Sequence, residues 1–168
     1  MNKKIRMGLI GAGRWGPNVL GALIRIEGIT VEFVADLNSD CLDILRTKFP
    51  SILTTTNPCE VLSNDNIDAV AICTPVKSHL DLVELALENG KHVFIEKPFG
   101  DDPERCESLC KLAIEKNVHI MVGHVFLFNA TILALKEIID SGTVGEILHI
   151  EAHRTNLGPV RKDVNAVW

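Results

Sequence analysis

The sequence has 168 residues, of which 46% are hydrophobic and 23% are charged, and its formal net charge is -5. This length and composition allow a sizeable hydrophobic core, which excludes an intrinsically disordered chain. The acidic balance, with no long basic tract and no long apolar run, gives no reason to expect binding to nucleic acid or to a membrane.

Short apolar runs alternate with amphipathic stretches along most of the chain. In chain order, strands are predicted at 5–10, 31–35, 51–54, 69–73, 92–95 and 119–122. Helices are predicted at 17–27, 40–48, from 57 onward, 78–89 and 103–117, with caps at Ser39 and Asp102 and a stop at Gly90. Apolar strands separated by helices predict an α/β fold, a Rossmann doubly wound parallel sheet over residues 1–123.

The pattern changes after Gly123. Residues 130–141 are predicted to form a helix that ends at Gly142, and alternation over 147–155 predicts a half-buried strand. A lone strand leaves backbone groups unpaired, so we expect it to pair with another chain, to fold back on the first domain or to stay mobile. A homo-oligomer, or disorder beyond about residue 156, follows from this expectation.

The first predicted strand runs directly into Gly11-Ala12-Gly13-Arg14-Trp15-Gly16, the G-x-G-x-x-G pattern, and a helix follows. In this context Gly11 permits a tight turn, Gly13 leaves room for a pyrophosphate, and Gly16 lets the helix pack on the strand. The N-terminus of the helix offers free N–H groups to phosphates. The pattern predicts a dinucleotide site that includes Arg14 and Trp15.

Asp36 stands at the end of the second predicted strand, about 20 residues after the glycine loop, where dinucleotide-binding proteins carry an acidic residue. Its carboxylate would accept hydrogen bonds from the adenosine ribose and repel the additional phosphate of NADP. No arginine follows it closely, so NAD is the predicted cofactor. A solvated strand end is the alternative for Asp36.

Three further motifs follow: Thr74-Pro75 with His79 shortly after, GKHVFIEKP at 90–98, and VGH at 122–124. Together with the glycine loop, they resemble the Gfo/Idh/MocA family of nicotinamide-dependent sugar oxidoreductases. The resemblance covers essentially the whole chain, and the Glu-Lys-Pro element is specific to this family among Rossmann proteins.

This resemblance implies that Thr74, Pro75, His79 and Glu96 lie at the cofactor. It also implies that Lys97 lies in the active site beside the nicotinamide and contacts the substrate. Removing a hydride from an alcohol requires that the hydroxyl proton also departs, so Lys97 would act as base or relay. A packing role remains open for His79, and an exposed strand end remains open for Lys97.

Two stretches, 15–18 (WGPN) and 154–168, resemble the sugar-nucleotide dehydrogenases of that family. The likeness implies oxidation of a secondary hydroxyl of a UDP-linked N-acetylated sugar or its uronic acid. The implied substrate-binding residues, which could equally be surface residues of a connecting loop, are Arg154, Asn156, Arg161 and Asn165. Relatives have a second α+β domain that roughly doubles the chain, so residues 124–168 are expected to be only its truncated beginning, and the chain to be inactive alone.

Two other functions stay open. One is a non-catalytic module that binds or senses NAD(H), and the other is a reductase of another Rossmann class, which the Glu-Lys-Pro element disfavours. Lys97 and the 154–168 stretch favour an enzyme, because a sensor needs neither. The five cysteines lack C-x-x-C spacing, so we expect reduced thiols, a cytoplasmic protein and no metal site.

Overall fold

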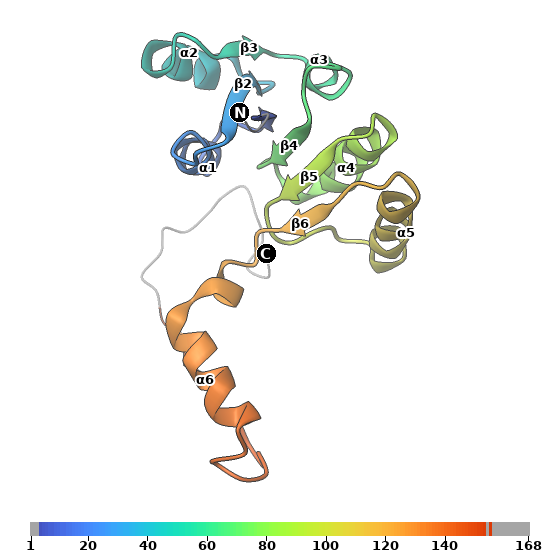
Figure 1. The fold of residues 1–168 in the computed structure, drawn as a ribbon. Coiled ribbons are helices and arrows are strands. Elements are labelled where there is room, and N and C mark those ends of the chain that lie inside the picture. The colour runs from blue at the N-terminus through green and yellow to red at the C-terminus, as the bar shows by residue number, and fades with distance from the viewer. Residues whose placement is uncertain (1–3, 154, 156–168) are drawn as a thin grey trace. The chain divides into compact units, whose positions relative to one another are not determined.

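The structure, a computed structural model, describes residues 4–153 and 155 (Figure 1). Contacts divide the chain into two compact units, Met1–His124 and Val125–Trp168, and each is described by itself. Within the described part of the chain, no helix has the length and apolar character needed to cross a membrane.

The first unit is built on a six-stranded sheet in the order β3-β2-β1-β4-β5-β6, and every neighbouring pair is parallel. The strands are β1 (Ile5–Ile10), β2 (Ile29–Ala35), β3 (Leu53–Thr55), β4 (Ala69–Ile72), β5 (His92–Ile95) and β6 (Ile120–Val122). The helices are α1 (Gly16–Leu23), α2 (Ser39–Lys48), α3 (Pro58–Leu62), α4 (His79–Glu88) and α5 (Pro103–Glu115), and a 3-10 turn, η1 (Val76–Ser78), precedes α4. The predicted Rossmann architecture is confirmed.

Two hydrophobic cores lie on opposite faces of the sheet. Successive residues of a strand point to opposite faces, so Ala69 joins one core and Val70 the other. Leu20 of α1 and Leu42 of α2 pack in the first core. Residues from the helices on the other face fill the second core: Val61 and Leu62 of α3, Val83 and Leu87 of α4, and Leu109 and Ala113 of α5. Helices therefore cover both faces, as a doubly wound sheet requires.

Local signals explain most helix ends. Asn38, rather than the predicted Ser39, caps α2, because its side chain accepts a hydrogen bond from the N–H of Asp40 at 3.0 Å. Asp102 caps α5 as predicted, accepting from the N–H of Arg105. Helix α1 ends at Leu23, before the predicted residue 27, because the next hydrogen bonds tighten, with the N–H of Ile26 donating to the carbonyl of Leu23.

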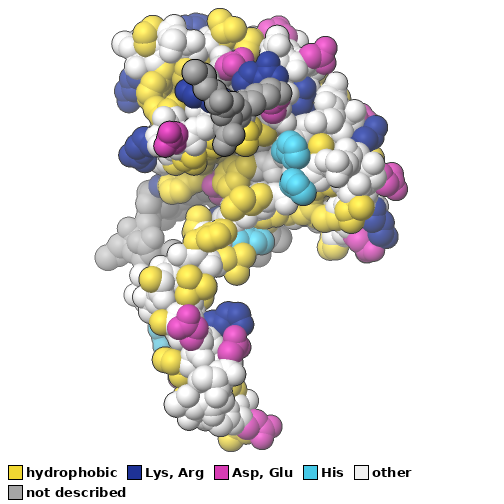
Figure 2. All heavy atoms as spheres, viewed as in Figure 1, with side chains coloured by type: hydrophobic (Ala, Val, Ile, Leu, Met, Phe, Trp, Pro, Cys, Tyr) yellow, Lys and Arg dark blue, Asp and Glu magenta, His cyan; other side chains and the backbone are white. Residues whose placement is uncertain are grey.

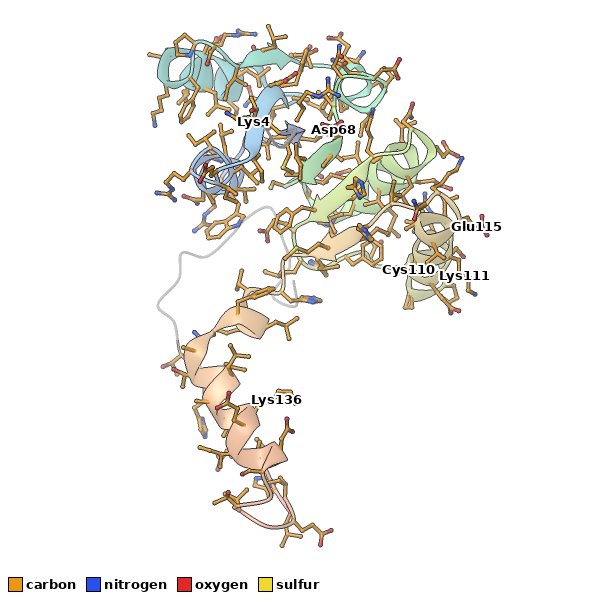
Figure 3. The ribbon with its side chains drawn as sticks, in the orientation of Figure 1. Lys4, Asp68, Cys110, Lys111, Glu115 and Lys136 are labelled. Carbon is orange, nitrogen blue, oxygen red and sulfur yellow. The ribbon has the colours of Figure 1, made fainter. Side chains whose placement is uncertain are left out.

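Exposed polar side chains mark the outer surface of the helical layers. Cys110, Lys111 and Glu115 lie along α5 in this way (Figure 3). No group of three His, Cys, Asp or Glu side chains among the residues described here is arranged to hold a metal ion.

The second unit contains η2 (Val125–Phe128) and α6 (Ala130–Asp140), and Asn129 caps α6 by accepting from the N–H of Thr131. None of the residues of α6 is buried, and hydrophobic side chains are visible along this unit (Figure 2). The predicted strand over 147–155 is wrong for residues 147–153 and 155, which form no strand. The physical reason is that a strand needs a neighbour for its backbone hydrogen bonds, and no strand among the described residues pairs with this segment.

Candidate functional site

The predicted cofactor residues follow the carboxyl ends of the strands, at one edge of the sheet. β1 and β4 are neighbours, but the chain leaves β1 toward β2 and leaves β4 toward β5, in opposite directions. Open α/β sheets bind ligands where the strand order reverses in this way. The segments after the two strands meet closely, because a Cβ built on Gly11 would lie 2.7 Å from the carbonyl carbon of Cys73.

The glycine loop, residues 11–16, has the geometry that a dinucleotide pyrophosphate requires. Gly11 has a φ of 98°, which glycine adopts without strain. A Cβ on Gly16 would lie 2.0 Å from the carbonyl oxygen of Gly11, so only glycine lets α1 approach this closely. A Cβ on Gly13 would meet nothing within 4 Å beyond its chain neighbours. Gly13 therefore leaves an open cradle, and the loop fits the predicted cofactor.

Asp36 lies directly after β2 and holds the glycine loop. Its Oδ2 accepts a hydrogen bond from the N–H of Ala12 at 2.6 Å, and its Oδ1 accepts from the N–H of Asn38 at 2.8 Å. These bonds orient the carboxylate, and each oxygen keeps a further lone pair. The carboxylate can therefore still accept hydrogen bonds from ribose hydroxyl groups.

His79 is buried between the segments that follow β4 and β5. Only 1% of the residue is exposed, its Nδ1 lies 2.8 Å from the carbonyl oxygen of Pro98, and its Nε2 lies 2.8 Å from that of Thr74. The tautomer decides which oxygen receives the donated hydrogen bond. His79 thus links Thr74-Pro75 to the cis Lys97-Pro98 peptide. Protein groups occupy both ring nitrogens, which agrees with the packing role left open by the sequence.

Glu96 and Lys97 follow β5, beside the end of β4. The N–H of Glu96 donates to the carbonyl of Ile72 at 2.9 Å, and its Oε1 accepts a hydrogen bond from the indole Nε1–H of Trp15 at 2.8 Å. Sequence analysis did not anticipate this bond between the Glu-Lys-Pro element and the glycine loop. Lys97 is exposed, so its amino group is accessible to a ligand.

Cys73 lies between these groups, directly after β4, and sequence analysis assigned it no role. Burial, with a smaller contribution from the negative charge of Glu96, raises the pKa of the Cys73 thiol to about 12. At neutral pH the thiol remains protonated and is a poor nucleophile and a poor base.

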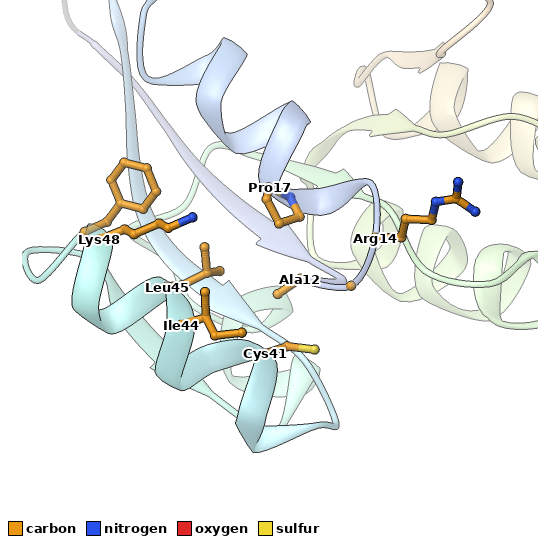
Figure 4. A pocket seen from close by; sticks show the side chains of 9 residues that line it. Ala12, Arg14, Pro17, Cys41, Ile44, Leu45 and Lys48 are labelled. Carbon is orange, nitrogen blue, oxygen red and sulfur yellow. The ribbon is translucent and has the colours of Figure 1, made fainter. Parts of the chain in front are cut away.

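A cavity of about 360 Å³ lies between the glycine loop and α2 (Figure 4). Its mostly apolar lining includes Ala12, Gly13, Cys41, Ile44 and Lys48. The side chain of Arg14, which also borders the cavity, extends away from α2. The glycine-loop pattern predicted one side of this cavity, and sequence analysis did not predict the side formed by α2.

The structure therefore brings most of the predicted site to one edge of the sheet: the glycine loop, Asp36, Thr74, Pro75, Glu96 and Lys97. The predicted substrate-binding residues Arg154, Asn156, Arg161 and Asn165 lie outside the described residues.

Comparison with known proteins agrees with this geometry. The model of an oxidoreductase family with an NAD-binding Rossmann fold, Gfo/Idh/MocA, matches residues 5–124. The chain belongs to the Gfo/Idh/MocA family. It carries the NAD-binding domain of that family, so the cofactor predicted from the glycine loop and Asp36 is confirmed.

Several Gfo/Idh/MocA relatives are inositol dehydrogenases. The inositol 2-dehydrogenase of Rhizobium meliloti (strain 1021) is 32% identical over 85% of this chain and 43% of its own length. The structure of scyllo-inositol dehydrogenase from Lactobacillus casei with bound NAD(H) and scyllo-inositol has a TM-score of 0.79 at 27% identity, over 86% of this chain and 43% of that one. Myo-inositol 2-dehydrogenase from Lactobacillus plantarum has a TM-score of 0.80 at 28% identity, with the same coverage of 86% and 43%. The chain thus spans less than half the length of these relatives.

Proposed function

We propose that this chain is the cofactor-binding part of an NAD-dependent dehydrogenase that oxidises a secondary hydroxyl of a sugar or cyclic polyol. The observation that carries the proposal is that the open cradle at Gly13 and the exposed amine of Lys97 follow β1 and β5, with β4 between them. A dinucleotide with its phosphates at Gly13 would extend across the end of β4 toward Lys97. When bound, its nicotinamide accepts the hydride from the carbinol carbon.

The role proposed for Lys97 is to remove the hydroxyl proton. Hydride loss alone would leave a protonated carbonyl, so a base or relay within hydrogen-bond reach of the hydroxyl is needed. The Cys73 thiol is a poor candidate for this role, because burial raises its pKa to about 12. Lys97 is an accessible amine at the end of β5, next to where the nicotinamide would lie.

The inositol dehydrogenases among the relatives support a cyclic polyol or sugar as the substrate class. The stretches 15–18 and 154–168 instead support a narrower alternative, a UDP-linked N-acetylated sugar or its uronic acid. The discriminating comparison is the rate of NADH formation with myo-inositol, scyllo-inositol and UDP-N-acetylglucosamine.

A separate assay tests the role of Lys97, with the chain joined to the substrate domain of a relative. We propose a fusion of this chain to the C-terminal part of the Rhizobium meliloti inositol 2-dehydrogenase, with the 168-residue chain as the reference. The borrowed part would itself favour inositol, so this fusion tests the role of Lys97 and does not discriminate between the substrate classes. We expect the chain alone to bind NAD without turnover and the fusion to form NADH with inositol. Lys97→Ala should abolish turnover in the fusion and leave NAD binding within a few-fold, whereas Lys111→Ala on α5 should change neither. Full turnover by the Lys97→Ala fusion would refute the role of Lys97.

We also propose that the second unit, the expected beginning of a substrate domain, associates with a second copy of this chain. The evidence is the apolar surface of α6, where Ile132, Leu133, Leu135 and Ile138 are each 43–50% exposed. Burial of such a surface is favourable, and a second copy of the chain could provide the cover. Light scattering after size exclusion should show a dimer or larger assembly, and Leu135→Glu should shift it toward the monomer. A monomer at all concentrations would contradict self-association.

A further inference from the structure

The glycine loop is held by a carboxylate on each side. Asp36, after β2, accepts a hydrogen bond from the N–H of Ala12 at 2.6 Å, and Glu96, after β5, accepts from the indole N–H of Trp15 at 2.8 Å. The strand order β2-β1-β4-β5 places these two carboxylates on opposite sides of the loop. Gly13, with its open cradle, lies in the sequence between the two tethered residues.

The position of the Trp15 ring depends more on its hydrogen bond to Glu96, called the tether below, than on packing. Trp15 is 52% exposed, so burial alone does not fix the position of its ring. Glu96 is more firmly placed. Its N–H donates to the carbonyl of Ile72 on β4, and a Cβ built on Gly123 would lie 3.3 Å from its Oε1. The main chain of Glu96 is therefore fixed to β4, and its carboxylate lies near Gly123, directly after β6.

We propose that Glu96 is a positioning residue for the phosphate-binding loop, acting through the indole of Trp15. The loop that receives the cofactor phosphates is thereby tied to the element that carries Lys97, so the cradle is preformed before the cofactor binds. A binding loop held in its bound conformation loses less entropy when the ligand arrives. The inference rests on the proposed cofactor-binding role of this edge and adds a task for a residue that need not touch the cofactor.

A direct contact of Glu96 with the nicotinamide makes a different prediction. A preformed loop helps any ligand that carries the pyrophosphate, including ADP-ribose, which lacks the nicotinamide ring. A direct contact would increase the affinity for NAD and leave the affinity for ADP-ribose unchanged. The amide oxygen of a glutamine could still accept from the indole N–H, so Glu96→Gln keeps the tether whereas Glu96→Ala removes it.

The experiment is calorimetric titration of the 168-residue chain with NAD and, separately, with ADP-ribose. Glu96→Ala and Trp15→Phe should each weaken both ligands about three- to tenfold, the effect of losing one net hydrogen bond. The double variant should bind the ligands no more weakly than either single variant, because the two substitutions remove the same hydrogen bond. Glu96→Gln should bind within about twofold of the parent, as should the control Glu115→Ala on α5.

A second readout needs no cofactor. Trp15 and Trp168 are the two tryptophans of the chain, so Trp168→Phe leaves Trp15 as the sole emitter. In this background Glu96→Ala should increase quenching of the indole by acrylamide, and Glu96→Gln should not. This readout also covers the case in which Glu96→Ala folds poorly, because Trp15→Phe changes an exposed ring and remains testable by titration.

Several outcomes would overturn the inference. They are unchanged binding by Glu96→Ala and Trp15→Phe, additive losses in the double variant, and a loss confined to NAD. A parent chain that binds neither NAD nor ADP-ribose would instead overturn the cofactor role and this inference with it. The two failures are therefore distinguishable.

Discussion

Asp36 accepts a hydrogen bond from the main-chain N–H of Ala12 at 2.6 Å, although the two residues lie on different strand-to-helix connections. The carboxylate that is predicted to bind the adenosine ribose therefore also holds the phosphate-binding loop. Removal of this side chain should affect cofactor affinity in two ways at once.

We expect Asp36→Ala to weaken NAD binding about ten- to a hundredfold, because hydrogen bonds to a charged group contribute about 1.5–3 kcal/mol each. Asp36→Asn is the matched variant, since it keeps an acceptor for the N–H of Ala12 but removes the charge. It should lose less NAD affinity and reject NADP less strongly. Calorimetry with both cofactors measures this, and an Asp36→Ala variant with parental affinity would contradict it.

Substitution by alanine should lower NAD affinity at Gly13 and lower stability at Gly16. Gly13→Ala adds a methyl group to open space, so the thermal midpoint of unfolding should stay unchanged. NAD affinity should fall at least tenfold, because the methyl group takes space that the pyrophosphate needs. Gly16→Ala would place a Cβ 2.0 Å from the carbonyl oxygen of Gly11. It should therefore lower the free energy of unfolding by about 1–3 kcal/mol, as overpacking does. Thermal melts and titration separate the two effects, and a Gly13→Ala variant that binds NAD normally would remove the cradle from the site.

His79→Ala should destabilise the first unit, because the carbonyl oxygen that accepts from the imidazole N–H, that of Thr74 or of Pro98 according to the tautomer, loses its donor. Loss of a partner to a buried polar group costs about 1–3 kcal/mol. Chemical denaturation measures the change, and His149→Ala, at an exposed position of the second unit, serves as the control. Equal stability of the two variants would show that the imidazole does not hold these segments together.

Cys73 should resist alkylation well above neutral pH. With its pKa raised to about 12, it should react with iodoacetamide far more slowly at pH 8 than the exposed Cys59 and Cys110. Peptide mapping after timed labelling gives the three rates. Glu96→Gln should speed the reaction modestly, because burial contributes more to the shift than the carboxylate does. Fast labelling of Cys73 in the folded parent would contradict its burial.

The same thiol predicts the sign of a pH effect on stability. The folded pKa lies above the ordinary value of 9.0, so the folded state keeps a proton that the unfolded state loses. The contribution of this thiol to the free energy of unfolding is fully present below pH 9 and is lost as the pH rises toward 12. Denaturation of Cys73→Ala, compared with the parent between these limits, should show a shallower loss of stability, and parallel curves would contradict this.

The first unit should fold without the second. Met1–His124 contains both hydrophobic cores and the whole sheet, so a fragment of residues 1–124 should bind NAD within about twofold of the full chain. Circular dichroism and calorimetry test the fragment. An unfolded fragment would show that the first unit needs residues after 124 in order to fold.

Sequence patterns predicted the sheet well, because strand and helix periodicity depends on residues close together in the chain. The predicted strand at 92–95 agrees with β5, and the pattern of Gly11, Gly13 and Gly16 foretold a loop whose backbone geometry the structure confirms. The same local alternation failed for residues 147–153 and 155, since a strand forms only where another strand accepts its hydrogen bonds.

The sequence by itself determined the fold class and the phosphate-binding loop, because turn geometry and helix capping act over a few residues. Only the tertiary structure decided that Trp15 bonds to Glu96, that His79 joins the segments after β4 and β5, and that Cys73 stays protonated. Trp15 and Glu96 are 81 positions apart and meet only because the strand order brings β1, β4 and β5 together at one edge. A bond, a burial or a shifted pKa of this kind depends on which strands are neighbours, and local sequence does not specify neighbours.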